Sequence, residues 1–324
     1  MELPRRVFLQ LAAAVAAALP ATTRTASATD YPTRPVRILV GFPPGATIAA
    51  HIMAQWLSDR LGQQFIVENR PGAATNIATE AVVRAPTDGY TLLAATANNT
   101  VNGAVYQNLG FNFVRDITMV AGIIRQPLVL EVNPTVPVKS VTELIASAEA
   151  NPGKITLASY GTGTISHVTG ELFKTRAGVE MIHIPYRGAA PMVTDLLGGQ
   201  VQAAFDALPT SIEHIRTGKL RALAVTTVRR AQALPNVPTM SEFMPGFEAS
   251  GWIGIGAPSG TPPEIIDKLN QEINVGLANP TINKRIVDLG GEPFVSSPAD
   301  LAKFVAEKTE AWAKVVRAAN IRAE

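Results

Sequence analysis

Residues 159–167 read SYGTGTISH and separate an apolar run, ITLA, from a helix-like run, VTGELFKTRAG. A glycine-rich turn between a strand and a helix exposes backbone N–H groups at the helix N-terminus, where anions bind. Gly161 and Gly163 permit a close approach of the main chain, and Ser159, Thr162 and Thr164 add hydroxyl donors. These residue types predict an anion-binding loop.

A second stretch has the same organisation about 120 residues earlier. VRILVGFPPG (36–45) is an apolar strand candidate followed by a glycine- and proline-rich turn and a helical pattern. Either turn alone is equally compatible with a tight strand-to-helix connection. Because both follow strands at the carboxyl edge, where open α/β sheets bind ligands, the pair favours two similar domains whose glycine loops face one cleft.

The sequence lacks several common catalytic motifs. Ser166 stands where a dinucleotide fingerprint needs its third glycine, and neither a phosphate-binding Gly-Lys-Ser/Thr nor a G-x-S-x-G elbow occurs. The four histidines (His51, His167, His183 and His214) do not have metal-ligand spacing, and the acidic residues are scattered. His167 lies in the first turn after the loop, where ligand contact and packing or capping are both compatible.

An exported α/β hydrolase or isomerase is the alternative from another class. It would need His167 or Asp206 as a general base beside a nucleophile, and no partner stands at a recognisable spacing. Asp206 ends the strand candidate VQAAFD, a position suited to capping a helix or to holding a bridging water. The residues therefore favour a binding protein over an enzyme.

The first 28 residues predict export. Arg5 and Arg6 precede the apolar run Val7–Leu19, and Ala26-Ser27-Ala28 is typical of a signal-peptide cleavage site after Ala28. Paired arginines before Val-Phe-Leu favour twin-arginine export, although a Sec signal is also compatible. Without this leader the formal net charge falls from +2 to zero, which gives no basic field for nucleic acid or anionic lipid. The absence of cysteine excludes disulfides and thiolate chemistry.

Apolar strand candidates alternate with helical patterns along the rest of the chain, which predicts an α/β fold with parallel sheets covered by helices on both faces. The expected strands are 36–42, 64–69, 87–96, 127–133, 154–159, 181–188, 201–208, 220–227 and 252–258, and the expected later helices are Val141–Ala150, Pro263–Ala278, Thr281–Leu289 and Pro298–Ala319.

Eight stretches carry a family resemblance: GFPPG (41–45), LGQQFIVENRPGA (61–73), TDGYTLL (87–93), HIPYRGAAP (183–191), TDLLGGQVQAAFD (194–206), GKLRALAVTT (218–227), LPNVPT (234–239) and GWIGIGAPSGTP (251–262). From Tyr31 almost to the end, the chain resembles the extracytoplasmic receptors of tripartite tricarboxylate transporters, the Bug family. The resemblance implies a two-lobed periplasmic binding protein of type II-like architecture that closes around a carboxylate and delivers it to a membrane permease. It implies no cofactor, no nucleic acid and a monomer. A sensor receptor for a signalling system would use the same binding chemistry.

The expected lobes are 31–124 plus 252–324 and, for the second, 125–251. The hinge is expected near 122–127 and 245–252, because both stretches contain glycine and proline and lie between predicted elements. Ligand binding between the lobes would then favour the closed form.

No arginine or lysine occurs in 41–58 or 159–173, so a carboxylate held there relies on N–H donors, hydroxyls and helix dipoles. Phe42 and Tyr186 are expected to wall the cleft. The expected ligand-binding residues are Phe42, Pro44, Gly45, Ala46, Thr47, Ala73, Thr96, Asn98, Ser159, Tyr160, Gly161, Thr162, Gly163, Thr164, His167, Tyr186 and Asp206.

The first loop departs from the family pattern. Relatives usually carry FPPGG or FPAGG followed by an aspartate and an Ala-Arg pair, whereas this chain is two residues shorter, with Thr47 near the aspartate's place and His51 near the arginine's. PGAATNIA likewise replaces the commoner PGAGGNIG. Because an acidic group suits a ligand's ammonium, its absence predicts an amine-free ligand, either a dicarboxylate or an aromatic carboxylate.

Overall fold

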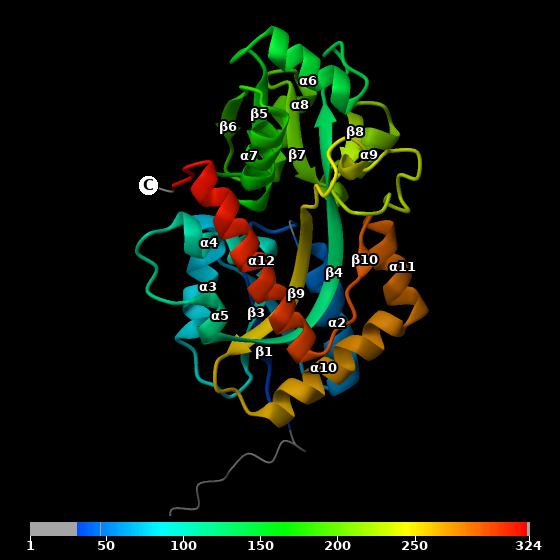
Figure 1. The fold of residues 1–324 in the computed structure, drawn as a ribbon. Helices are drawn as coiled ribbons and strands as arrows, with labels where there is room; N and C mark the ends of the chain where they lie inside the picture. Colours follow the sequence, from blue (N-terminus) through cyan, green and yellow to red (C-terminus); the bar gives the residue numbers. More distant parts are fainter. Residues whose placement is uncertain (1–30, 46, 323–324) are drawn as a thin grey trace, which may run out of the picture.

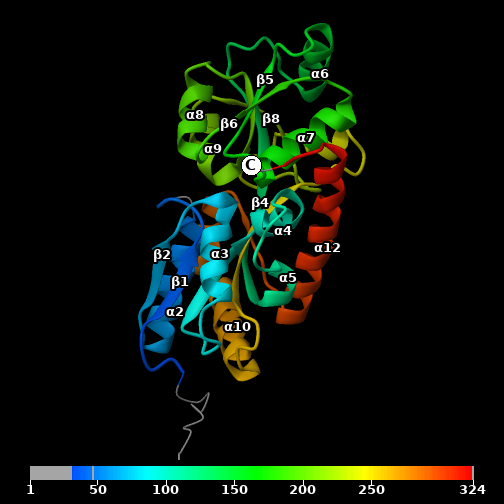
Figure 2. The same ribbon diagram turned by 90° about the vertical axis from the view of Figure 1, so that its left-hand side faces the viewer.

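The computed structural model describes residues 31–45 and 47–322 of the 324-residue chain. The expected signal peptide, 1–28, and the candidate ligand residue Ala46 lie outside these ranges. The chain forms two lobes joined by two strands (Figures 1 and 2). The α/β, two-lobed fold predicted from the sequence is confirmed, and within the described ranges no helix is both long enough and apolar enough to cross a bilayer.

The lower lobe in Figure 1 is a sheet in the order β2-β1-β3-β9-β4, with β10 beside β4. Strands β1, β2 and β3 are parallel, whereas β9 is antiparallel to β3 and to β4. Its strands are β1 (Val36–Val40), β2 (Phe65–Asn69), β3 (Thr91–Thr96), β4 (Ile117–Val132), β9 (Ser250–Pro258) and β10 (Glu292–Pro293). Its helices are α2 (Ile48–Leu61), η2 (Ala73–Thr75), α3 (Asn76–Val83), α4 (Ala97–Val105), α5 (Phe113–Asp116), α10 (Pro263–Ala278), α11 (Pro280–Asp288) and α12 (Pro298–Ala318).

Apolar side chains on both faces of this sheet are buried, as expected for strands covered by helices. Met53 and Leu57 of α2 and Leu269 of α10 pack with Ile38 on one face. On the other face α12 packs against α4 and continues upward to contact α7 of the second lobe (Figure 2). The last helix therefore touches both lobes.

The upper lobe is a smaller sheet in the order β6-β5-β7-β4, with β8 also paired to β4. Strands β5, β6 and β7 are parallel to one another, and β4 is antiparallel to β7 and β8. Its remaining elements are α6 (Val141–Ala150), β5 (Thr156–Ser159), α7 (Ile165–Ala177), β6 (Ile182–Pro185), α8 (Ala189–Leu197), β7 (Ala203–Ala207), α9 (Leu208–Arg216), β8 (Arg221–Val225) and η3 (Met240–Glu242).

Strand β4 belongs to both sheets. Residues 117–127 pair with β9, and residues 128–132 pair with β7 and β8. The expectation that 122–127 lies between regular elements is wrong, because β9 supplies a partner up to Pro127, which lies opposite Ser250. Proline has no N–H to donate to a neighbouring strand, and Pro127 lies at the point where the pairing with β9 ends and the pairing with β7 begins. The antiparallel β4 and β9 make both sheets mixed.

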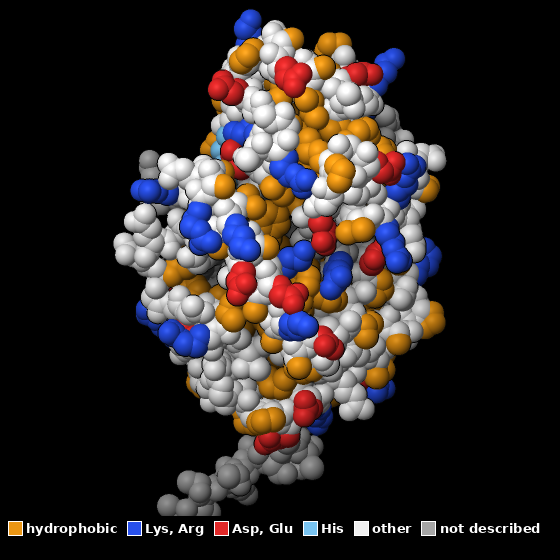
Figure 3. Space-filling model, in the orientation of Figure 1, with side chains coloured by type: hydrophobic (Ala, Val, Ile, Leu, Met, Phe, Trp, Pro, Cys, Tyr) orange, Lys and Arg blue, Asp and Glu red, His pale blue; other side chains and the backbone are white. Residues whose placement is uncertain are grey.

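Charged side chains of both signs are interspersed on the face shown in Figure 3. The described residues include surface ion pairs, such as Arg230–Glu242 at 2.8 Å and Lys308–Glu248 at 3.3 Å. This face therefore presents no single-signed field that would attract a polyanion.

A run of left-handed residues precedes α3. Ala73, Ala74 and Thr75 have φ values of 44°, 48° and 84°, a region that side chains with a Cβ rarely adopt. Asn102 Nδ2 donates to the Ala74 carbonyl at 2.7 Å, and Asn99 Nδ2 donates to Thr75 Oγ1 at 3.1 Å. These bonds hold the conformation where the family pattern has glycines, so alanine and threonine carry strain here.

Substitution Ala74→Gly is expected to raise the free energy of unfolding by about 1 kcal/mol, because glycine adopts φ near 48° without a Cβ clash. Urea unfolding measures the change. Ala81→Gly within α3 is the matched control, and we expect it to lower stability by about 1 kcal/mol. Equal destabilisation by both variants would show that Ala74 is not strained.

Candidate functional site

Helix α4, which directly follows β3, meets the turn after β5 across the two lobes. Ile165, the first residue of α7, donates its N–H to Asn98 Oδ1 of α4 at 2.9 Å. A Cβ on Gly163 would lie 2.7 Å from Val105 Cγ1 of α4, so only glycine fits this approach. Helix α4 of the lower lobe is therefore in direct contact with the turn that joins β5 to α7 in the upper lobe.

Buried donors without a partner among the described residues lie in this part of the lower lobe, and they include Asn76 Nδ2 as well as the two that follow β1 and β3. Thr47, which precedes α2, and Asn98 are each 1% exposed. Thr47 Oγ1 and Asn98 Nδ2 have no hydrogen-bond partner among the described residues, and Thr47 makes no side-chain cap to α2. Buried polar groups are nearly always paired, so these two donors suit an acceptor from outside the chain. Strands β1 and β3 are parallel neighbours, so the segments that follow them, which carry Thr47 and Asn98, leave the same edge of the sheet.

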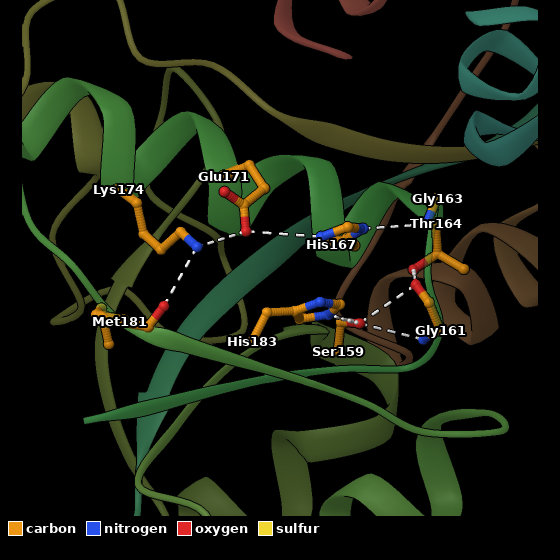
Figure 4. Close-up of polar contacts among 9 residues, drawn as sticks. All are labelled: Ser159, Gly161, Gly163, Thr164, His167, Glu171, Lys174, Met181 and His183. Atoms are coloured by element: carbon orange, nitrogen blue, oxygen red, sulfur yellow. Dashed lines mark hydrogen bonds and ion pairs between the residues drawn. The ribbon is translucent and has the colours of Figure 1, made fainter. Parts of the chain in front are cut away.

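Residues 159–164 form the second glycine loop, and hydrogen bonds to neighbouring side chains hold it in place (Figure 4). Gly163 N–H donates to His167 Nδ1 at 3.0 Å, and Gly161 N–H donates to Ser159 Oγ at 3.2 Å. Ser159 Oγ lies 2.7 Å from His183 Nε2. The amides of both glycines are thus already engaged, and Thr164 Oγ1 closes the turn by donating to the Gly161 carbonyl at 2.6 Å.

The two imidazoles stack. The rings of His167 and His183 are 3.7 Å apart with an interplanar angle of 7°. Burial is the main cause that lowers the pKa of His183, to about 3, so the His183 ring is neutral. His183 comes from β6, the neighbour of β5, and sequence reasoning identified it only as a lone histidine.

Glu171 and Lys174 extend this cluster along α7. Glu171 Oε1 lies 3.6 Å from His167 Nε2 and 2.6 Å from Lys174 Nζ. Burial opposes ionisation of Glu171, but the contacts with His167 and Lys174 outweigh it and hold its pKa below the ordinary value. The sequence contained a signal for both residues, because positions i, i+4 and i+7 share one helix face.

The remaining expected ligand residues divide by exposure. Phe42 is half-buried against the α2 core, and its carbonyl accepts from Asn69 Nδ2 at 2.8 Å. Thr96 caps α4 together with Asn99. Tyr186 donates its hydroxyl to Asp195 Oδ2 at 2.7 Å. Tyr160 is half-buried, whereas the exposed members are Pro44, Gly45, Ala73 and Thr162.

Asp206 lies inside the upper lobe. Its carboxyl is fully buried, with Oδ1 accepting from Ala207 N–H and Oδ2 lying 2.8 Å from Ser211 Oγ of α9. Glu131 Oε1 is also 2.8 Å from Ser211 Oγ. Burial raises the pKa of Asp206 to about 6 and, with the Asp206 charge, raises that of Glu131 well above its usual range. Asp206 is therefore hydrogen-bonded to Ser211 of α9 inside the lobe and does not face solvent.

Within residues 31–45 and 47–322, no three His, Asp or Glu side chains lie close enough together to hold a metal ion.

Comparison with known proteins places this geometry in a family. Residues 49–321 match the model of the tripartite tricarboxylate transporter family receptor. The chain is 39% identical over 296 residues to Protein BugT of Bordetella pertussis, which covers 90% of this chain and 91% of BugT.

Two solved structures from Rhodopseudomonas palustris share the fold and carry ligands. Rpa4515 with adipate is 36% identical, with a TM-score of 0.86 over 90% of this chain and all of that one. MatC with bound malate is 29% identical, with a TM-score of 0.81 over 88% of this chain and all of that one. The matched family is one of transporter receptors, which bind substrates and are not enzymes. The chain belongs to the tripartite tricarboxylate transporter receptor family, which includes the Bug proteins.

Proposed function

We propose that this protein binds a small dicarboxylate between its lobes and delivers it to the membrane permease of a tripartite tricarboxylate transporter. The observation that carries the proposal is the pair of buried donors, Thr47 Oγ1 and Asn98 Nδ2, that have no partner among the described residues. The adipate and malate held by two relatives support the ligand class, because both are dicarboxylates without an amine.

Uncharged donors are sufficient for such a ligand. A hydrogen bond to a charged group contributes about 1.5–3 kcal/mol, so three to five of them supply much of the roughly 8 kcal/mol of micromolar binding after ordering costs. We assign these bonds to Thr47, Asn98, the first-turn amides of α2 and the exposed Thr162. The stretches 41–58, 96–112 and 159–173 contain no arginine or lysine.

Closure of the lobes would occur about a hinge at 122–127 and 245–252, with 31–124 plus 252–324 as one lobe and 125–251 as the other. The change of pairing partner at Pro127 supports this position. The contact of α12 with α7 must shift as the lobes move, since α12 is anchored on α4. A ligand that bonds both Asn98 and the second loop favours the closed form.

Export completes the proposal. Cleavage after Ala28 would release the mature receptor into the periplasm as a monomer, where the permease is its partner. A role as a sensor receptor would leave the binding chemistry unchanged, and transport of the ligand by cells with and without this protein distinguishes the two.

Isothermal titration calorimetry of the protein with residues 1–28 removed tests the ligand class. We expect adipate or malate to bind with one site per chain and micromolar affinity, and glutamate and aspartate to bind at least about 10-fold more weakly, because each ammonium lacks an acidic partner. Selective, tight binding of glutamate or aspartate would contradict the assignment. Stabilisation by sugars but not by any carboxylate would overturn the function.

A further inference from the structure

We propose that Glu171 is a positioning residue for the second glycine loop, because it holds His167 in the one tautomer that can accept the Gly163 amide. The inference rests on the proposed function in one respect, namely that this loop contacts the carboxylate. Figure 4 shows the chain of contacts from Lys174 through Glu171 and His167 to Gly163.

Two contacts specify the same tautomer of His167. Nδ1 accepts the Gly163 N–H at 3.0 Å, so Nδ1 carries no proton and the proton of the neutral ring is on Nε2. Nε2 faces Glu171 Oε1 at 3.6 Å, an electrostatic contact that is favourable when Nε2 carries the proton. The opposite tautomer would set a lone pair against the carboxylate and an N–H against an N–H.

Glu171 is itself held in place. Lys174 Nζ lies 2.6 Å from Glu171 Oε1 and also donates to the Met181 carbonyl at 3.3 Å. The side chains of Glu171 and Lys174 are only 15% and 17% exposed, which limits screening of their charges by water. The carboxylate therefore presents a fixed negative charge to the imidazole.

His183 completes the support from the other face of the ring. Ser159 Oγ accepts the Gly161 N–H at 3.2 Å and lies within hydrogen-bond distance of two further groups, the Gly161 carbonyl at 3.2 Å and His183 Nε2 at 2.7 Å. Each stacked imidazole thus fixes one glycine of the loop, His167 directly and His183 through Ser159. The His183 ring covers one face of the His167 ring, with the two centroids 3.7 Å apart.

Loop position matters because the next residues touch the lower lobe. Gly163 has φ +74° and lies against Val105, and the Ile165 N–H reaches Asn98. If His167 loses its preferred tautomer, the Gly163 amide loses its acceptor and the first turn of α7 shifts relative to Asn98. Affinity for the ligand is then expected to fall, although Glu171 itself does not contact the ligand.

The test uses the mature protein, and the His167 tautomer and the Gly163 amide exchange are measured first without ligand. In the wild type, ¹⁵N NMR should show His167 protonated on Nε2 and bare on Nδ1, with a protected Gly163 amide. Glu171→Ala should mix the tautomers, speed Gly163 amide exchange about 10-fold and weaken adipate binding about 10-fold, as one lost hydrogen bond implies. Glu149→Ala, an exposed glutamate of α6 in the same lobe, is the matched control.

A conservative pair of variants separates positioning from folding. Asn has an oxygen near the place of Nδ1, so His167→Asn should retain the Gly163 protection that His167→Ala loses. A wild-type ring protonated on Nδ1, or a Glu171→Ala variant with unchanged tautomer and exchange, would overturn the proposal. An altered tautomer with unchanged adipate affinity would also overturn it. If no carboxylate binds the wild type while the tautomer and exchange results hold, the proposed function fails and the positioning of the loop stands.

Discussion

Asn98→Asp is expected to weaken adipate binding by about 100-fold or more. The aspartate keeps an oxygen that can accept the Ile165 N–H, so the contact between the lobes persists. It replaces the free donor, Nδ2, with an anionic oxygen. One hydrogen bond to a charged group, about 1.5–3 kcal/mol, is lost, and repulsion between like charges is added. Calorimetry with adipate measures the change.

Asn112→Asp supplies the control for this prediction. Asn112 is an exposed N-cap of α5, where aspartate caps as well as asparagine, so adipate affinity should be unchanged. The melting temperature of Asn98→Asp should remain near that of the wild type, because its new charge lies at the N-termini of α4 and α7. An affinity within about threefold of the wild type would remove Asn98 from the site.

Glu131→Gln is expected to raise the free energy of unfolding by about 2 kcal/mol at pH 7. Ser211 has one hydroxyl proton but lies 2.8 Å from carboxyl oxygens of both Glu131 and Asp206, so one carboxyl must itself carry a proton. Asp206 accepts the Ala207 amide, which favours its charged form, whereas Glu131 Oε2 has no partner among the described residues. Glu131 is therefore the protonated member.

The pH dependence of stability follows from this proton. Burial raises the pKa of both carboxyls in the folded state, to about 6 for Asp206, so between roughly pH 4 and these raised values the folded protein binds more protons than the unfolded chain. Stability of the wild type must fall as pH rises through this window. Glutamine keeps a neutral donor beside Ser211 and removes most of that fall.

Urea unfolding at pH 5 and pH 8 measures the difference. The advantage of Glu131→Gln over the wild type should be small at pH 5 and largest at pH 8. The exposed Glu149→Gln should follow the wild type at both values. Identical pH slopes for Glu131→Gln and the wild type would show that the pair does not share a buried proton.

Local signals in the sequence located most of the helices. Helices α6 and α10 have the bounds expected from the sequence, because apolar periodicity and caps are short-range features. Ser140, for example, accepts the Glu143 N–H at 3.1 Å and begins α6. The first half of β4 was missed, since strand pairing with β9 joins segments more than 100 residues apart.

The candidate site divides in the same way. The two glycine loops were identifiable from residue type, because a turn that joins a strand to a helix and exposes amides needs glycine. Which amides are already bonded depends on residues that arrive from elsewhere in the fold. His183 reaches Ser159 only through the pairing of β6 with β5, and Asp206 is enclosed by Glu131 and Ser211 from two other elements.

A crystal structure of the mature protein with adipate tests the central claim most directly. We expect one carboxylate to lie within hydrogen-bond distance of Thr47 Oγ1 and Asn98 Nδ2, held by uncharged donors from both lobes. Arg187, exposed in the loop that follows β6, is a cation that follows a strand at the same edge of the upper sheet. A carboxylate clamped chiefly by Arg187 or another guanidinium, with Thr47 and Asn98 out of contact, would contradict the account.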